Sequence, residues 1–447
     1  MSSLVKEIKN PYGRVFRRLL VKRKLASTGL FETDWQDITA DVQSWGKVRK
    51  QIDDVRYGQL TFSDILMKLD NSRGSYNPED DEFSLWFGYG SQQRSLVKME
   101  SGFLHQTKTA GGIWTNTEFP TTSSVYHGIV SGDIPLSDQN SITFPVRPLL
   151  QVFKDFPARN LVGFTSTGMT ASQFATMIRD QTDGAGSFIF RPFFGDTSTN
   201  WNITPTTNIY TQLNTATAAD VFDSSVWDIF QKLLEAENMV VYIKRDGSFN
   251  FTNRDAGSTA AFQFFGAGFF DTEYGHTIKK ISRYGKKQTD YYSRVEVKFR
   301  EDDTLTSFRV RETAFTVTGS NDPWNRGHRT FAFENLWIAN TASADTILDT
   351  IFNNVSILKN QIEFTSSFVP HLEVLDRIQI SYDSGAPEPS SRWDMADWAD
   401  VGTNTASDLI WSDAGGDAIR LVGQDFKILS IELDLDKLET KVSGITA

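Results

Sequence analysis

Cysteine is absent from this 447-residue chain, and histidine occurs only five times. Without cysteine the chain has no disulfide scaffold, no thiol nucleophile and no cysteine-ligated metal. The histidines stand singly and far apart, so we expect no zinc site and no other metal: His105, His127, His276, His328 and His371.

Long apolar runs are also missing. The run Met239–Ile243 is far shorter than the roughly 20 residues that a membrane-spanning helix needs. The opening residues, MSSLVKEIKN, lack the apolar centre of a secretory signal. We therefore expect a soluble protein with no membrane insertion that is not exported by that route.

Aromatic residues, in contrast, are abundant: 34 Phe, 12 Tyr and 11 Trp. Together with many short alternating runs, they favour sheet over helix. The length allows two to four domains, each with its own core. The sequence thus predicts a mostly β protein.

The net charge of -11 argues against a general nucleic-acid binder, since phosphate affinity depends on clustered Lys and Arg. Positive charge is concentrated in two runs, Lys6–Lys24 and Lys279–Lys287. We interpret both as solvated or partner-facing surfaces, with contact to passing DNA as the alternative.

Strands dominate the first region, 1–154, and their spacing fits a small barrel. The runs are Val15–Leu25, Leu60–Leu69, Leu96–Phe103, Val125–Val130 and Ile142–Val146. The second run ends in the turn cluster Asp70–Gly74, where Asn, Asp and Gly tolerate left-handed backbone.

Two helical patterns mark the middle region, 155–275, which we expect to be α+β. Thr170 precedes one amphipathic stretch, and Asp223 or Ser224 can cap the other, which begins near Val226. Asp246-Gly247 then separates two apolar strands, the strongest short signal for a β-hairpin.

Alternating strands return in the last region, 276–447, which is expected to form a second barrel. A helix that starts near Ser343 is expected to pack on it, and a hairpin should turn near Asp436-Lys437. The segment 384–418 differs in composition and reads as an insertion between strands. Its three tryptophans, Trp393, Trp398 and Trp411, either pack on their own barrel or bind a partner.

No catalytic constellation emerges. Gly163–Thr170 has the outline of a phosphate-binding loop, but Met169 stands where the motif needs Lys. The acids at 79–82 and at 394, 397 and 400 are dense enough to suggest a glycosidase, yet they sit in polar loops that would not separate their pKa values. We predict no enzyme activity and no cofactor.

Three segments resemble, in order along the chain, the tail hub (baseplate hub) proteins of tailed bacteriophages. The first is LDNSRGSYNP followed by SLWFGYGSQQRSLVKMESGF, and the second is ENMVVYIKRDGSFNFTNRD after the helix at Val226. The third comprises the closing strands LEVLDRIQISY and DFKILSIELDLDKLETKVSGI.

This resemblance implies two tail-tube-like barrels, 1–154 and 276–447, that flank or interleave with a smaller helix-hairpin domain. It implies a homotrimer whose six barrels form a ring between the hexameric tail tube and the threefold tail tip. Expected neighbours are the tube or distal tail protein, the central fibre or spike and the tape measure protein. DNA would pass through the lumen without specific binding, in a virion tail assembled in the host cytoplasm.

Two other functions remain open at the level of sequence. A receptor- or carbohydrate-binding tail-tip protein would use the insertion, or the loop that contains Trp86, Phe87 and Tyr89, as an aromatic platform. A cell-wall hydrolase ranks below it. Ring formation would separate the hub from the first, and peptidoglycan turnover would separate it from the second.

Overall fold

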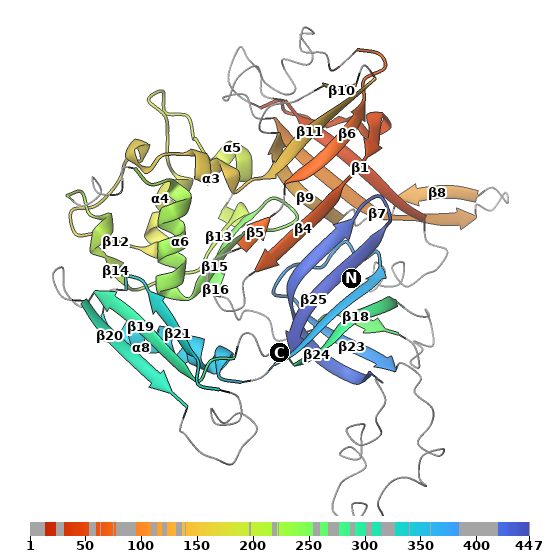
Figure 1. Ribbon diagram of the computed structural model, residues 1–447. Helices are drawn as coiled ribbons and strands as arrows, with labels where there is room; N and C mark the ends of the chain where they lie inside the picture. The colour runs from red at the N-terminus through yellow and green to blue at the C-terminus, as the bar shows by residue number, and fades with distance from the viewer. Residues whose placement is uncertain are drawn as a thin grey trace, which may run out of the picture.

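The computed structural model shows a mostly β chain with two large sheets and a helical part beside them (Figure 1). It describes residues 14–23, 31–52, 60–62, 64–74, 76, 95–108, 114–118, 123–130, 136–138, 140–195, 198–216, 221, 223–253, 260–266, 277–286, 291–300, 306–313, 327–338, 340–357, 359–383 and 419–446. Within these ranges, no helix combines the length and apolar character needed to span a membrane.

The first sheet is built from the N-terminal third of the chain, in the order β2-β1-β7-β9-β11-β6-β3, with β8 beside β7 and β10 beside β11. Its strands are β1 (Arg14–Lys22), β2 (Gln36–Asp37), β3 (Val42–Ser44), β6 (Ile65–Asp70), β7 (Leu96–Lys108), β8 (Trp114–Glu118), β9 (Ser123–Val130), β10 (Leu136–Asp138) and β11 (Ser141–Pro148). Alternation of buried and exposed residues along β6 gives this sheet one apolar face.

The second sheet has the order β17-β23-β24-β25-β22-β18. In addition, β4 pairs with the C-terminal half of β24, and β5 pairs with β4. Its strands are β4 (Lys47–Ile52), β5 (Leu60–Phe62), β17 (Ala260–Phe265), β18 (Ile278–Lys286), β22 (Asn360–Ser367), β23 (Arg377–Asp383), β24 (Arg420–Asp434) and β25 (Glu439–Thr446). The predicted terminal hairpin is confirmed, because β24 and β25 pair antiparallel around residues 435–438.

Six strands of each sheet follow the same spatial order. Counted along the chain, β1, β3, β6, β7, β9 and β11 lie in the order first, fourth, fifth, sixth, third, second. The strands β17, β18, β22, β23, β24 and β25 lie in that order too. Neighbours are antiparallel in both sheets, except that β17 runs parallel to β23 whereas β1 runs antiparallel to β7.

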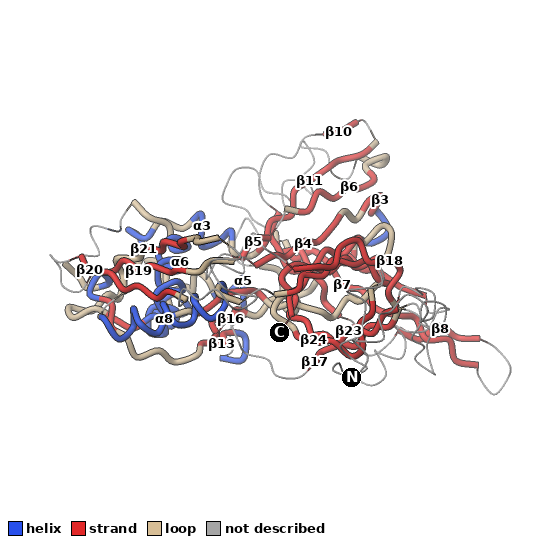
Figure 2. Tube along the Cα trace, turned by 60° about the horizontal axis from the view of Figure 1, so that its bottom comes forward, coloured by secondary structure: helices blue, strands red, loops and turns tan. Residues whose placement is uncertain are grey.

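Helices and short strands form the remaining part, which lies beside the two sheets (Figure 2). The helices are α3 (Gln151–Asp155), α4 (Ala171–Arg179), α5 (Arg191–Phe194), α6 (Val226–Glu237) and α8 (Thr341–Val355), with 3-10 turns η1 (Thr39–Asp41), η3 (Ala158–Asn160), η4 (Ser198–Asn200) and η5 (Thr211–Leu213). The strands are β12 (Met169–Thr170), β13 (Trp201–Ile203), β14 (Ile209–Tyr210), β15 (Met239–Ile243), β16 (Phe249–Asn253), β19 (Arg294–Arg300), β20 (Thr306–Glu312) and β21 (Thr330–Glu334).

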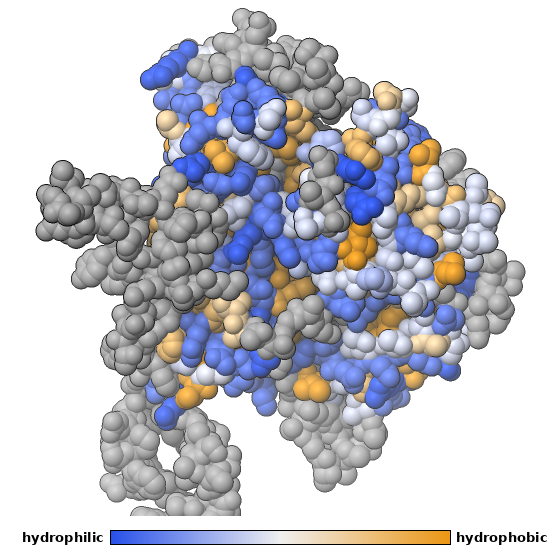
Figure 3. Space-filling view, turned by 180° about the vertical axis from the view of Figure 1, so that it is seen from behind, coloured by the Kyte–Doolittle hydropathy of each residue, from blue (hydrophilic) through white to orange (hydrophobic). Residues whose placement is uncertain are grey.

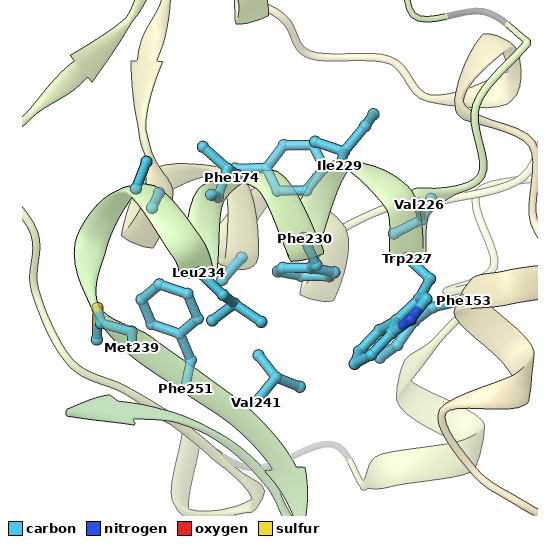
Figure 4. Packing of buried hydrophobic residues seen from close by; sticks show 14 of the residues in the cluster. Phe153, Phe174, Val226, Trp227, Ile229, Phe230, Leu234, Met239, Val241 and Phe251 are labelled. Carbon is cyan, nitrogen blue, oxygen red and sulfur yellow. The ribbon is translucent and has the colours of Figure 1, made fainter. Parts of the chain in front are cut away.

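Both middle helices begin where side chains satisfy their free N–H groups. Thr170 caps α4, as the sequence predicts, and it forms a capping box with Gln173. On α6 the cap is Ser225, paired with Asp228, so the predicted cap at Asp223 or Ser224 falls one or two residues early. Figure 4 shows Phe230 and Leu234 of α6 packed over the sheet strands that carry Val241 and Phe251.

The predicted hairpin is confirmed as β15 and β16, which pair antiparallel from Met239–Asn253 to Ile243–Phe249. Successive residues of β15 are buried in two different hydrophobic cores. Val240 is buried in the core shared by the two large sheets, and Val241 is buried in the core of the helical part. The hairpin therefore forms a wall between the two cores.

Two predictions about single elements are wrong. The run Leu60–Leu69 is not one strand: β5 pairs with β4 in the second sheet, and β6 pairs with β11 in the first. The helix expected to pack on the second barrel, α8, packs instead on β19 and β20 and shares the helical core through Ile347, Ile351 and Val355.

Contacts also cross both expected domain boundaries. From the first region, β4 and β5 join the second sheet. From the last region, β19, β21 and α8 share a core with the helices of the middle region. In each sheet the chain departs at the same point, between the second and the third of the six corresponding strands.

Gly46 makes the corner at which the chain leaves the first sheet. Its φ is +69°, and a Cβ there would lie 2.8 Å from the Leu66 carbonyl oxygen. Because left-handed backbone is unfavourable for residues with a Cβ, and this one would also collide with a backbone atom, no larger side chain fits without distortion.

We expect Gly46→Ala to lower the free energy of unfolding by at least about 2 kcal/mol, since conformational strain and a backbone clash add. Gly186→Ala is the matched control, because Gly186 has φ +84° but a Cβ added there would meet no atom within 4 Å. It should cost only about 1 kcal/mol. Equal losses in urea titrations of the two variants would contradict the role given to the corner.

Candidate functional site

The tip of the β15–β16 hairpin, residues 244–248, is a compact turn held by its own hydrogen bonds. The Lys244 N–H donates to the Ser248 carbonyl oxygen at 3.0 Å, and the Gly247 N–H donates to the Lys244 carbonyl oxygen at 2.9 Å. Asp246 accepts from the backbone N–H and the hydroxyl of Ser248 at 2.9 and 2.6 Å. Gly247 supplies the positive φ, +87°, that the turn requires.

On one side the tip rests on His127 of β9. A Cβ on Gly247 would lie 2.7 Å from His127 Nδ1, so only glycine allows this close approach. The edge of the Trp35 ring meets the same imidazole, with 6.1 Å between ring centroids. The hairpin tip is thus packed directly against the first sheet.

On the other side the tip is bonded to the turn 371–376 that precedes β23. The Arg245 N–H donates to Glu373 Oε1 at 3.0 Å, and Arg245 Nη1 donates to the His371 carbonyl oxygen at 2.6 Å. Glu373 Oε2 accepts from Lys50 Nζ at 2.6 Å, and Lys50 is buried on β4. Glu373 therefore joins the hairpin to two parts of the second sheet, β4 and the turn before β23.

A second carboxylate organises the turn itself. Asp376 Oδ2 accepts from the Glu373 N–H at 2.8 Å, and the Asp376 carbonyl oxygen accepts from the Ile428 N–H of β24 at 2.9 Å. Burial, together with the nearby charge of Glu373, raises the pKa of Asp376 to about 6.

The two histidines at this junction have low basicity. Burial, with the charge of Lys98 added, lowers the pKa of His127 to about 3. Burial, with the charge of Arg245 added, lowers the pKa of His371 to about 4. Neither His127 Nε2 nor His371 Nδ1 has a hydrogen-bond partner among the described residues.

A second polar junction links the two large sheets directly. Asp436, in the β24–β25 turn, accepts from Ser44 Oγ, Trp45 N–H and Gly46 N–H at 3.0, 3.1 and 3.3 Å. Arg17 of β1 donates to the Leu435 carbonyl oxygen and lies 5.2 Å from the centre of the Trp45 ring.

This geometry also explains much of the N-terminal basic run. Besides Arg17, Arg18 pairs with Asp37 at 3.4 Å and with Glu100 at 3.7 Å. Arg23 pairs with Glu32 at 2.6 Å. In the described part of the run these three arginines contact acids or carbonyls of the same chain, so they are not simply a solvated surface. The second basic run places Lys279, Lys280, Arg283 and Lys286 on β18, an edge strand.

The sequence-predicted partner-binding residues, Trp393, Trp398 and Trp411, lie outside the described residues, and so does the whole segment 384–418. The aromatic loop around Trp86, Phe87 and Tyr89 also lies outside them. Among the residues that are described, no group of three or more His, Asp or Glu side chains is arranged to hold a metal ion.

Sequence reasoning missed the junction around Glu373 because its members are far apart in the chain. One signal was available. Along β4 the inward positions are Val48, Lys50 and Ile52, so a lysine occupies the apolar phase of an alternating strand. A lysine there requires a buried carboxylate, but the strand does not reveal which one.

No family model and no curated protein matches the chain. Solved structures of three tail proteins are similar to it, each over 96% of this chain. They are the tail protein from Neisseria meningitidis MC58 (9% identity, 96% of that chain, TM-score 0.46), the 43 kDa tail protein of prophage MuSo2 from Shewanella oneidensis (12%, 98%, 0.46) and prophage tail protein gp18 from Listeria monocytogenes EGD-e (11%, 94%, 0.47). All three solved structures are of tail proteins.

The buried ion pair gives a direct test of the junction. Glu373→Gln keeps an acceptor for the Arg245 N–H but removes the carboxylate that is paired with the buried Lys50 charge. We expect the free energy of unfolding to fall by about 3 to 5 kcal/mol, and Lys50→Met combined with Glu373→Gln to recover most of it. Urea titrations measure both.

The control is Glu334→Gln, which breaks the pair with Lys298 at 2.9 Å, where the side chains are 52% and 45% exposed. Its effect should stay within about 0.5 kcal/mol. If Glu373→Gln lowers the free energy of unfolding no more than Glu334→Gln does, the junction contributes little to stability.

Proposed function

We propose that the chain is a structural protein of a phage tail tip: a tail hub that forms a trimeric ring between the tail tube and the tip. The observation that carries the proposal is the strand order that recurs in the two large sheets. The three sequence segments that resemble hub proteins support the proposal as well.

Symmetry supplies the physical reason. A threefold object can cap a sixfold tube if each subunit offers two comparable docking surfaces. Two sheets with one strand order in one chain are candidates for those surfaces, and three chains would bring six of them into a ring. The proposed units are the barrels at 1–154 and 276–447 and the middle domain at 155–275. The strand β17 of the middle domain completes the second sheet, and β4–β5 and β19–α8 are excursions that tie the units together.

The polar junctions suit such a role. Asp436 and Glu373 both join segments more than three hundred positions apart, Ser44 to Asp436 and Lys50 to Glu373. The Asp436 bonds link the first sheet to the second, whereas the Lys50–Glu373 pair ties β4 and the hairpin tip to the turn before β23 within the second sheet.

Charge and surface character fit a channel component. The net charge of -11 would let DNA pass a negative wall without binding. On the face shown in Figure 3, the coloured residues place hydrophobic side chains in small separate patches among hydrophilic ones. Contacts made through that face would therefore depend on polar groups and strand edges. The expected neighbours are the tube or distal tail protein above and a fibre or spike below.

The proposed partner-binding element is the insertion 384–418 with its three tryptophans. Its two ends are neighbours, because Asp383 of β23 and Arg420 of β24 are paired residues and their side chains approach to 3.7 Å. The insertion thus replaces what would otherwise be a short hairpin loop.

Light scattering should give a particle of three times the 50.4 kDa chain mass. The same stoichiometry should hold in assembled tails, because a permanent ring needs large obligate interfaces, roughly 2,000 Å² or more each. A chain that stays monomeric in the particle, or six chains per ring, would overturn the proposal.

Replacing 384–418 with a two-residue hairpin turn should leave a folded trimer, since the paired strand ends already meet and loop-closure entropy changes slowly with length. Tail-tip completion should fail if the tryptophans bind a partner. Circular dichroism, light scattering and an assembly assay separate the outcomes. An insoluble shortened protein would show instead that the tryptophans belong to the core.

A further inference from the structure

The hairpin tip is held between two half-buried histidines, one on β9 of the first sheet and one in the turn before β23 of the second. Gly247 rests on the His127 ring from β9, and Arg245 donates to the His371 carbonyl oxygen from the turn before β23. Each imidazole has one ring nitrogen without a hydrogen-bond partner among the described residues. A proton placed on either of those nitrogens would have no acceptor while the tip is seated.

Each imidazole ring lies near at least one cationic side chain. His127 faces Lys98 of β7 and Lys50 of β4, with Asp246 of the tip as the opposing charge. His371 faces Arg245 of the tip, and the backbone at Ala261 forms a hydrogen bond with it. Lys50 also faces Asp376 and is paired with Glu373. A charged imidazole would therefore add positive charge beside an existing cation at each site.

We propose that the hairpin tip, residues 244–248, is an acid-releasable latch: protonation of His127 and His371 detaches it from the first sheet and from the turn 371–376. The device is independent of the proposed hub function. Release need not unfold the helical part, because the adjoining core contains Val241, Phe249 and Phe251 behind the tip.

The direction of the pH effect follows from linkage. The pKa values of about 3 for His127 and about 4 for His371 lie below the ordinary 6.5, so the closed state prefers neutral rings. Closure is favoured above pH 6.5, and this preference is lost as pH falls from 6.5 toward 4 and 3.

Asp376 acts in the opposite direction. Its pKa of about 6 in the closed state exceeds the ordinary 3.8, so a fall in pH from above 6 toward 3.8 favours closure. Between pH 7 and pH 5 each histidine favours opening about 20-fold and Asp376 opposes it about 10-fold, which gives a net increase of roughly 50-fold.

Hydrogen–deuterium exchange with mass spectrometry on the full chain tests the latch, after correction for the intrinsic pH dependence of exchange. Peptides that cover 244–248 should show the opening constant rising roughly 50-fold from pH 7 to pH 5, while peptides from α6 should not change. Asp376→Asn should enlarge the rise about 10-fold, since the opposing group is gone.

In the double variant His127→Gln and His371→Gln, a fall in pH from 7 to 5 should lower the opening constant about 10-fold, because only Asp376 still responds to pH. His328→Gln is the control, because His328 is 43% exposed and lies just before β21 rather than at the junction. A tip whose corrected exchange is independent of pH in the natural chain overturns the latch. The latch is also overturned if the double variant shows the same rise of the opening constant in acid as the natural chain. If that variant does not fold, the profiles of the natural chain and of Asp376→Asn still decide.

Discussion

The arrangement of the molecule depends on one short connection, between β3 and β4, at which the chain passes from the first sheet to the second. β3 pairs with β6 in the first sheet, and β4, which begins three residues after β3 ends, pairs with β24 in the second. Gly46 makes the corner with φ +69°, and Asp436 holds it through the Trp45 and Gly46 N–H groups. Because so short a connection cannot stretch, the two sheets must stay close together at this corner.

The two sheets share a strand order but differ in where the chain goes between the second and the third strand. In the first sheet the excursion after the second strand is β4–β5, which closes onto the other sheet. In the second sheet the excursion is β19 to α8, which packs with the helices. One architecture is thus used twice, and the difference between the copies ties the chain into a single body with the hairpin at its centre.

Patterns local in sequence predicted the local structure well. Thr170 as a cap, Asp246-Gly247 as a hairpin turn and Asp436-Lys437 as the terminal turn need only neighbouring residues to be recognised. The break at Leu60–Leu69 could not be predicted, because both halves are apolar and only partner strands decide that they lie in different sheets. For the same reason Lys50 could be noticed, whereas Glu373 as its partner could not.

The proposed ring uses the two sheets as equivalent units that are joined within each chain by the β3–β4 connection. The most direct measurement is electron cryomicroscopy of the purified chain or of the tail tip. We expect a ring of three chains in which the first and second sheets alternate at the same radius, with the β3–β4 connection at Gly46 joining them within each chain. Sheets at different radii, or a second sheet that faces away from the central channel, would contradict it.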